Sequence, residues 1–185
     1  EGTASQPIVF SALDPDINWD QILLAIDLLP NSIMRHVILN DGGGNDAGEE
    51  TAALEFQDIN GSPFAMPMVD HVTLNRSGSY GLYLQHNEDD VSPPSVTNVT
   101  INDSANAPIL ADAGALGGLG GTNSFSNNGV ERIEVGSGLN SGIFQHATWQ
   151  DHGIPYELTE GIYVRTTGLT PDAVRWTLDP GVTLL

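Results

Sequence analysis

The sequence has no cysteine and no lysine, and arginine supplies all five of its strongly basic residues. Without cysteine, neither a disulfide framework nor a thiolate metal site can form. The five arginines stand against 24 aspartates and glutamates, which gives a formal net charge of −19. Such a charge repels phosphate backbones and anionic headgroups, so we expect no nucleic-acid partner. We predict no cofactor, although calcium would suit so acidic a chain.

Long apolar runs are also missing. The longest mostly apolar run covers residues 22–30, well short of the roughly 20 residues that a membrane-spanning helix needs. No basic segment followed by an apolar one marks a signal peptide. Because the chain opens with Glu1 rather than methionine, we expect both ends to be cuts in a longer protein.

One alternating apolar pattern that ends in asparagine or glycine occurs four times. It covers residues 34–40, 69–75, 96–102 and 130–136. A second short apolar run follows each copy, at residues 54–57, 82–85, 109–111 and 143–146. Short runs that are rich in β-branched residues and bounded by Gly, Asn, Ser and Pro indicate strands. A single strand pair cannot bury its apolar face, so the repeats must stack on one another.

Alternation places equivalent apolar side chains of each repeat inside the stack. In the first strand these are Val37, Val72, Val99 and Ile133. In the second strand they are Leu54, Leu82, Ile109 and Ile143. A third strand would close each repeat, and residues 62–66 and 122–128 are the candidates, with Phe125 inward. The glycine-rich residues 113–121 predict a flexible loop.

An asparagine ends the first strand in three successive repeats. These residues are Asn40, Asn75 and Asn102, and Gly136 takes the fourth place. The corner after a strand needs a left-handed backbone, which Asn and Gly adopt at little cost. Stacked asparagines can also hydrogen-bond to one another along the axis of the stack. We therefore predict a structural ladder rather than a catalytic role.

Eight short segments stand in a characteristic order along the chain. They are PIVFS at residues 7–11, Trp19, NSI at 31–33, HVIL at 36–39, YGLYL at 80–84, IPY at 154–156, IYV at 162–164 and WTLDPGVTL at 176–184. In this order they resemble bacterial right-handed parallel β-helix repeat proteins of the pectate-lyase-like superfamily, over nearly the whole chain. The resemblance implies an all-β fold, a right-handed parallel β-helix, which is a single-stranded solenoid of roughly five coils with loop insertions.

The order of two of these segments suggests a longer array. In similar proteins the strand like WTLDPGVTL precedes, by about one coil, the strand like PIVFS. Here PIVFS lies near the start and residues 182–185 close the chain. We therefore expect residues 1–185 to be one segment of a longer tandem array, in which adjacent coils of the same protein are its partners.

The family holds enzymes, adhesins, phage fibres and surface proteins, so the fold alone does not give a function. The Asn-Thr-Asp and Gly-His-Gly elements of the related hydrolases are missing, and we predict no catalytic residue. We predict a structural or adhesive module of a secreted or cell-surface protein, such as a stalk, fibre or filament that can assemble with its own kind. The alternative is a β-helix that binds or degrades polysaccharide.

An aromatic group near the C-terminus is the candidate carbohydrate contact. It consists of Trp149, His152 and Tyr156. If these rings are exposed, they would suit stacking on a sugar. If they are packed, they would cover the edge of the solenoid.

Two further groups are candidates for holding a metal ion. Asp14, Asp16 and Asp20 place carboxylates at alternate positions, like the start of a calcium loop. The later glycine and bidentate glutamate of such a loop are missing, which favours a structural turn. His36 and His71 occupy the same repeat position, so we expect them to stack on one outer face. There they could share a metal ion, or only stack and hydrogen-bond.

Overall fold

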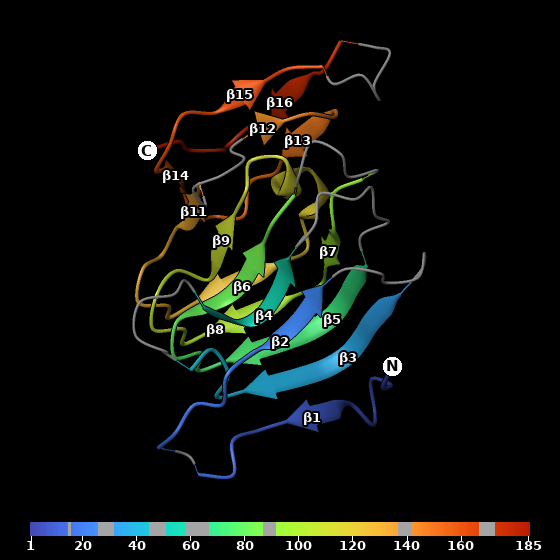
Figure 1. Cartoon of the computed structure of the whole chain (residues 1–185), viewed down its shortest axis with the longest axis vertical. Helices are drawn as coiled ribbons and strands as arrows, with labels where there is room; N and C mark the ends of the chain where they lie inside the picture. The colour runs from blue at the N-terminus through green and yellow to red at the C-terminus, as the bar shows by residue number, and fades with distance from the viewer. Residues whose placement is uncertain are drawn as a thin grey trace.

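The computed structural model describes residues 1–14, 16–25, 32–44, 51–57, 67–86, 92–136, 142–166 and 173–185. Those residues contain sixteen β-strands and one short 3-10 helix, η1 (Ala115–Gly118) (Figure 1). No helix in them is long and apolar enough to cross a membrane.

Most of the strands belong to two parallel sheets. The first sheet contains, in spatial order, β1 (Ile8–Phe10), β3 (Ile33–Asn40), β5 (Met68–Asn75), β8 (Thr100–Asn102) and β10 (Ser124–Ser126), and β7 (Ser95–Thr97) also pairs with β5. The second sheet contains β2 (Ile22–Ala25), β4 (Ala52–Gln57), β6 (Tyr80–Leu84), β9 (Ile109–Ala111), β11 (Ile133–Val135) and β14 (Tyr156–Leu158). Two small parallel pairs join β12 (Gly142–Ile143) to β15 (Tyr163–Val164) and β13 (Ala147–Trp149) to β16 (Trp176–Leu178).

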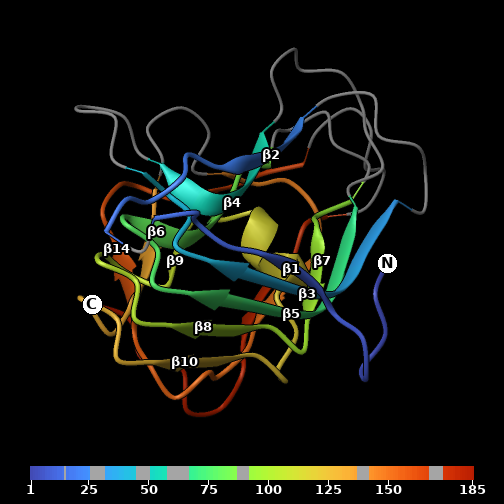
Figure 2. The ribbon, with the colours of Figure 1, turned by 90° about the horizontal axis from the view of Figure 1, so that it is seen from below.

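The order of strands within each large sheet is their order in the sequence. Over much of its length the chain passes from one sheet to the other and returns, so that each new strand lies beside an earlier one. Figure 1 shows the result: the N-terminal strands lie at one end of the long axis and the C-terminal strands at the other. Figure 2, seen from below, shows the strands of the first sheet lying side by side in the same order. The predicted all-β class with parallel strands is confirmed.

The core lies between the sheets and is built from rows of aliphatic side chains. In the first sheet Val37 pairs with Val72, and Leu39 pairs with Leu74. These four side chains are at most 4% exposed. Val99, in the connection between β7 and β8, is also buried. The corresponding row of the second sheet joins Leu54, Leu82, Ile109, Ile133 and Tyr156, all buried.

The fourth repeat does not lie where the sequence pattern predicts. Ile133 pairs with Ile109 and Tyr156 in the second sheet, and not in the row of Val37 and Val72. The first sheet continues instead through β10, where Phe125 pairs with Ile101. Alternating apolar residues do not reveal to which of two sheets a strand belongs, and β10 has only one apolar residue.

Two other predicted strand positions differ. Ile143 is buried as expected, but it lies in β12 and pairs with Val164 rather than joining the second sheet. Residues 122–128, predicted as a separate third strand, supply β10 of the first sheet. Residues 62–66 lie outside the described part of the chain.

The left-handed corner also lies one residue later than predicted. Asn40, Asn75 and Asn102 remain in their strands, because each pairs in register with the next. Positive φ angles occur instead at the residues that follow, which are Asp41, Arg76 and Asp103, and at Asn127 after Ser126; at the fourth predicted position, Gly136 does have a positive φ, of 129°. A second set of positive φ angles, between 51° and 54°, lies four residues before each asparagine, at His36, His71 and Asn98.

Residues 113–121 are not the flexible loop that their glycines suggest. Ala113, Ala115 and Leu116 are buried, and they belong to the main core. The glycines allow neighbouring backbone segments to approach closely. A Cβ atom on Gly118, for example, would collide with the carbonyl oxygen of Pro94. A glycine-rich composition therefore marks tight packing around η1.

Candidate functional site

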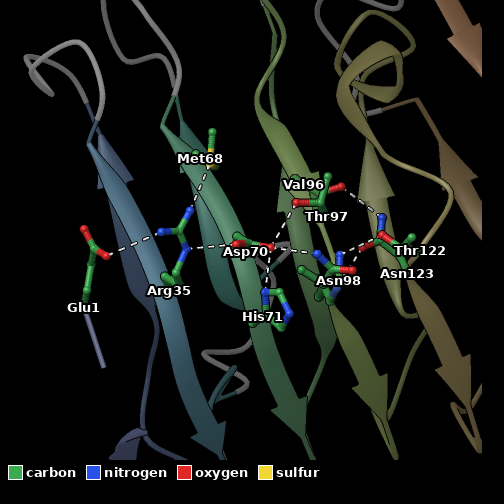
Figure 3. A network of polar contacts seen from close by, with 11 residues as sticks. Glu1, Arg35, Met68, Asp70, His71, Val96, Thr97, Asn98, Thr122 and Asn123 are labelled. Atoms are coloured by element: carbon green, nitrogen blue, oxygen red, sulfur yellow. Dashed lines mark hydrogen bonds and ion pairs between the residues drawn. The ribbon is translucent and has the colours of Figure 1, made fainter. Parts of the chain in front are cut away.

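A network of polar side chains lies on the outer face of the first sheet and is centred on Asp70 (Figure 3). Asp70 pairs with Arg35 on the neighbouring strand and with Thr97 on the other side. The Nε of Arg35 donates to Asp70 Oδ2 at 2.9 Å. The network therefore joins three adjacent strands, β3, β5 and β7.

The other oxygen of Asp70 accepts three hydrogen bonds. The donors are His71 Nδ1 at 2.8 Å, Asn98 Nδ2 at 2.8 Å and Thr97 Oγ1 at 3.3 Å. Desolvation alone would raise the pKa of Asp70, but the hydrogen bonds from Asn98, Arg35 and His71 outweigh it and lower the pKa to about 2. A carboxylate that is always ionised and has four donors is a poor general base. Asp70 acts as a fixed acceptor that holds the strands together.

Two side chains from the segment just before β10, Thr122 and Asn123, complete this network. The left-handed residue Asn98 separates β7 from β8, which both pair with β5. The Oδ1 of Asn123 accepts from the backbone N–H of Val99 at 2.8 Å, and its Nδ2 donates to the carbonyl of Val96 at 3.0 Å. The Oγ1 of Thr122 accepts from the N–H of Asn98 at 3.1 Å. Polar groups freed at the kink are thus satisfied by neighbouring side chains.

The role of Asp70 was not predicted, although the repeats contain a signal for it. Arg35, Asp70 and Thr97 occupy one position of the repeat, immediately before His36, His71 and Asn98. Opposite charges at equivalent positions of adjacent parallel strands form cross-strand pairs. Comparison of the repeats at this position would have predicted the Arg35–Asp70 pair.

The three ladder asparagines are the last residues of β3, β5 and β8. Asn75 Nδ2 donates to Asn40 Oδ1 at 2.9 Å, and Asn102 Nδ2 donates to Asn75 Oδ1 at 3.3 Å. Asn40 Nδ2 donates to Ser11 Oγ at 2.9 Å, and Ser126 Oγ donates to Asn102 Oδ1 at 2.6 Å. Five side chains thus form a continuous chain of hydrogen bonds across the sheet.

A charged pair follows the ladder. Arg76 donates to both oxygens of Asp41, from Nε at 2.7 Å and from Nη2 at 3.1 Å. The hydrogen bonds with Asp41 raise the pKa of Arg76, and the charges of Asp41 and Asp103 add to the effect. Asp41 is 9% exposed, so its carboxylate is largely buried where the chain turns after β3.

The predicted carbohydrate contact is wrong for two of its three residues, because they are buried. Trp149 is 0% exposed and Tyr156 is 1% exposed, and their rings stack with centroids 5.1 Å apart. Trp176 packs edge-on against Trp149 at 5.0 Å. The Nε1 of Trp149 donates to the carbonyl of Ala113 at 3.3 Å. No face of either ring is open to a sugar, and the group closes the core as the packed alternative predicted.

His152 is half-buried beside this aromatic group. Its ring lies 5.6 Å from that of Phe125 and 6.4 Å from that of Tyr156. Burial lowers the pKa of the imidazole, against the opposing charge of Asp151. The structure therefore gives His152 a packing role at the end of the first sheet.

The three aspartates near the N-terminus do not form a cage of oxygens. Asp14 Oδ1 accepts from the backbone N–H of Asp16 at 3.1 Å, and the carbonyl of Asp14 accepts from the N–H of Ile17 at 3.2 Å. These are the bonds of a turn. Within the described residues, no three His, Asp or Glu side chains, Asp20 included, come together to hold a metal ion.

A last polar cluster lies on the second sheet. Glu134 accepts from Tyr80 Oη at 2.8 Å and from Arg132 Nη2 at 3.2 Å. The Nε of Arg132 also lies 2.6 Å from Glu157 Oε2. Both oxygens of Glu134 are engaged, which favours a structural role here as well.

Comparison of the chain with protein-family models, with curated proteins and with solved structures finds no match.

Proposed function

We propose that this chain is a structural module, a segment of a right-handed parallel β-helix whose two ends stack on further coils of the same kind. The alternation of the chain between two parallel sheets supports a wound architecture. Crossover connections between parallel strands of one sheet are almost always right-handed, which supports that hand. The resemblance to pectate-lyase-like β-helix proteins supports the same reading.

The observation that carries the proposal is the exposure of apolar side chains at the ends of the buried rows. At the N-terminal end, Ile8 pairs with Val37 and Phe10 pairs with Leu39. Ile8 and Phe10 are 39% and 45% exposed, whereas Val37 and Leu39 are 4% and 0% exposed. Among the described strands β1 pairs only with β3, so its other edge has no partner strand there.

The C-terminal end repeats this arrangement. Val164 pairs with the fully buried Ile143, and Leu178 pairs with the fully buried Trp149. Val164 and Leu178 are 45% and 39% exposed. Apolar rows of the interior thus reach the surface at both ends.

A further coil would cover both exposed features of such an end. It would cover the exposed apolar side chains, and its strands would pair with the open backbone edge. Side chains of the same rows would continue the core without a break. The strongly acidic composition suits a secreted or cell-surface stalk, fibre or filament in a saline exterior.

Sedimentation equilibrium of the chain tests the proposal. The experiment uses about 0.5 M salt, because the negative charges must be screened before two copies can meet. We expect concentration-dependent end-to-end association, which Phe10→Lys and Leu178→Lys each reduce. Thr73→Lys, on the outer face of a central strand, is the matched control. A wild-type chain that stays monomeric up to high concentration would overturn the proposal.

A further inference from the structure

Two histidines lie side by side on the outer face of the first sheet. His36 and His71 follow the paired residues Arg35 and Asp70 on adjacent strands. Their ring centroids are 4.9 Å apart, with an angle of 45° between the ring planes. The two residues have φ angles of 51° and 53°, so the same backbone conformation directs both side chains to the same side.

The orientation of one of these rings is fixed. The ionised carboxylate of Asp70 can only accept, so His71 Nδ1 carries the proton of their 2.8 Å hydrogen bond. In the neutral imidazole the lone pair then lies on Nε2. Asp70 is itself held by Arg35 and Asn98 (Figure 3). A histidine oriented by a carboxylate in this way is the usual arrangement of a metal ligand and its supporting residue.

We propose that His36 and His71 form a two-histidine binding site for a divalent transition-metal ion, with copper(II) bound most tightly and water completing the coordination. Two nitrogens that each lie about 2 Å from one ion are about 3–4 Å apart, which rings at this spacing reach by small rotations. Imidazole favours copper, zinc and nickel, whereas calcium requires oxygen ligands. The net charge of −19 raises the local concentration of any cation.

The site has a defined extent along the sheet. The equivalent position of the next strand is Asn98, whose amide is already bonded to Asp70. The ion would therefore join β3 to β5 and no further. Because the two histidines come from different repeats, metal binding would cross-link them and raise the thermal stability of the chain.

Isothermal titration with copper(II) chloride, combined with electron paramagnetic resonance of the complex, tests the site on the intact chain. We expect one tightly bound ion per chain, with a spectrum that shows nitrogen coordination. Binding through surface carboxylates would give a spectrum of oxygen ligands alone, and that result would overturn the proposal without any variant.

The variants His36→Asn and His71→Asn identify the ligands. Asparagine suits the left-handed backbone, since Asn98 has a φ of 54° at the equivalent position, so both variants should keep the fold. We expect each variant to weaken copper binding by at least about tenfold, which is the loss typical when a residue that supports a metal ligand is removed. The exposed His146→Asn is the matched control and should bind as the wild type does. Loss in only one of the two variants, or in neither, contradicts a shared site.

Discussion

The two faces of the first sheet hold neighbouring strands together in different ways. The inner face stacks valine on valine and leucine on leucine, and such contacts have no preferred direction. The outer face carries the asparagine ladder and the Asp70 network, in which hydrogen bonds join specific donors and acceptors on adjacent strands, such as Asn75 to Asn40 and Arg35 to Asp70. The inner rows therefore supply most of the stability, and the outer groups fix which residues face each other.

The largest loss of stability should come from a substitution on the inner face. Leu74 is fully buried in the middle of its row, so Leu74→Ala should lower the free energy of unfolding by about 2–5 kcal/mol. Phe10 occupies the end of the same row and is 45% exposed. Phe10→Ala should cost less than half as much in urea denaturation. Equal losses would show that burial in the row is not the source of stability.

A buried histidine should make stability sensitive to mild acid. His86 is 1% exposed, and neither ring nitrogen has a hydrogen-bond partner in the structure as described. Burial lowers its pKa from 6.5 to about 4. Between about pH 6.5 and pH 4 this histidine is therefore protonated in the unfolded chain but neutral in the folded chain. The free energy of unfolding should fall by up to about 3 kcal/mol as the pH is lowered through this range.

Removal of the titrating group checks this dependence. His86→Leu should flatten the curve of unfolding free energy against pH in that range. An unchanged slope in His86→Leu would assign the dependence to other groups.

The stabilisation that the outer face provides should be lost at lower pH. The pKa of Asp70 is lowered to about 2 in the folded chain and is about 3.9 in an unfolded one. Its contribution to stability is complete above about pH 4 and is lost as the pH falls towards 2. Asp70→Asn should cost about 1–2 kcal/mol at pH 7 and almost nothing at pH 2. A constant cost across this range would argue against the ionised network.

The smallest effect should come from the asparagine ladder. Asn75 donates to Asn40 and accepts from Asn102, but it is half-buried, so water can replace both partners. We expect Asn75→Ala to cost about 1 kcal/mol in the same denaturation assay. A loss as large as that of Leu74→Ala would place the ladder among the main sources of stability.

The pattern of apolar residues predicted the structure best where the strands are long and the repeats are close copies. Three repeats keep the same spacing around one valine. Val37 and Val72 therefore pair in a buried row, and Val99 is buried at the equivalent position of the third repeat. The pattern placed Phe125 inward, as found, but did not assign its strand to the first sheet, since one apolar residue between two serines gives no alternation to detect. It also misassigned Ile133, because loops of different length separate the strands and hide the count that distinguishes the two sheets.

The candidate sites were harder to predict than the fold. Whether Trp149 and Tyr156 are exposed depends on which segments lie above them, and no local pattern carries that information. The pairing of His36 with His71 followed from the repeat alone. The supporting role of Asp70 depends on a kink at Asn98, which the pattern of apolar residues does not record.

The charges that flank the two longest strands have a consequence for misassembly. β3 contains Arg35 near its start and is followed by Asp41, whereas β5 contains Asp70 near its start and is followed by Arg76, so the same two positions carry opposite signs. Side by side, the two strands attract each other at both ends. Two copies of β3 aligned in parallel would instead place arginine on arginine and aspartate on aspartate. The chain thereby disfavours the in-register pairing of identical segments from which amyloid grows.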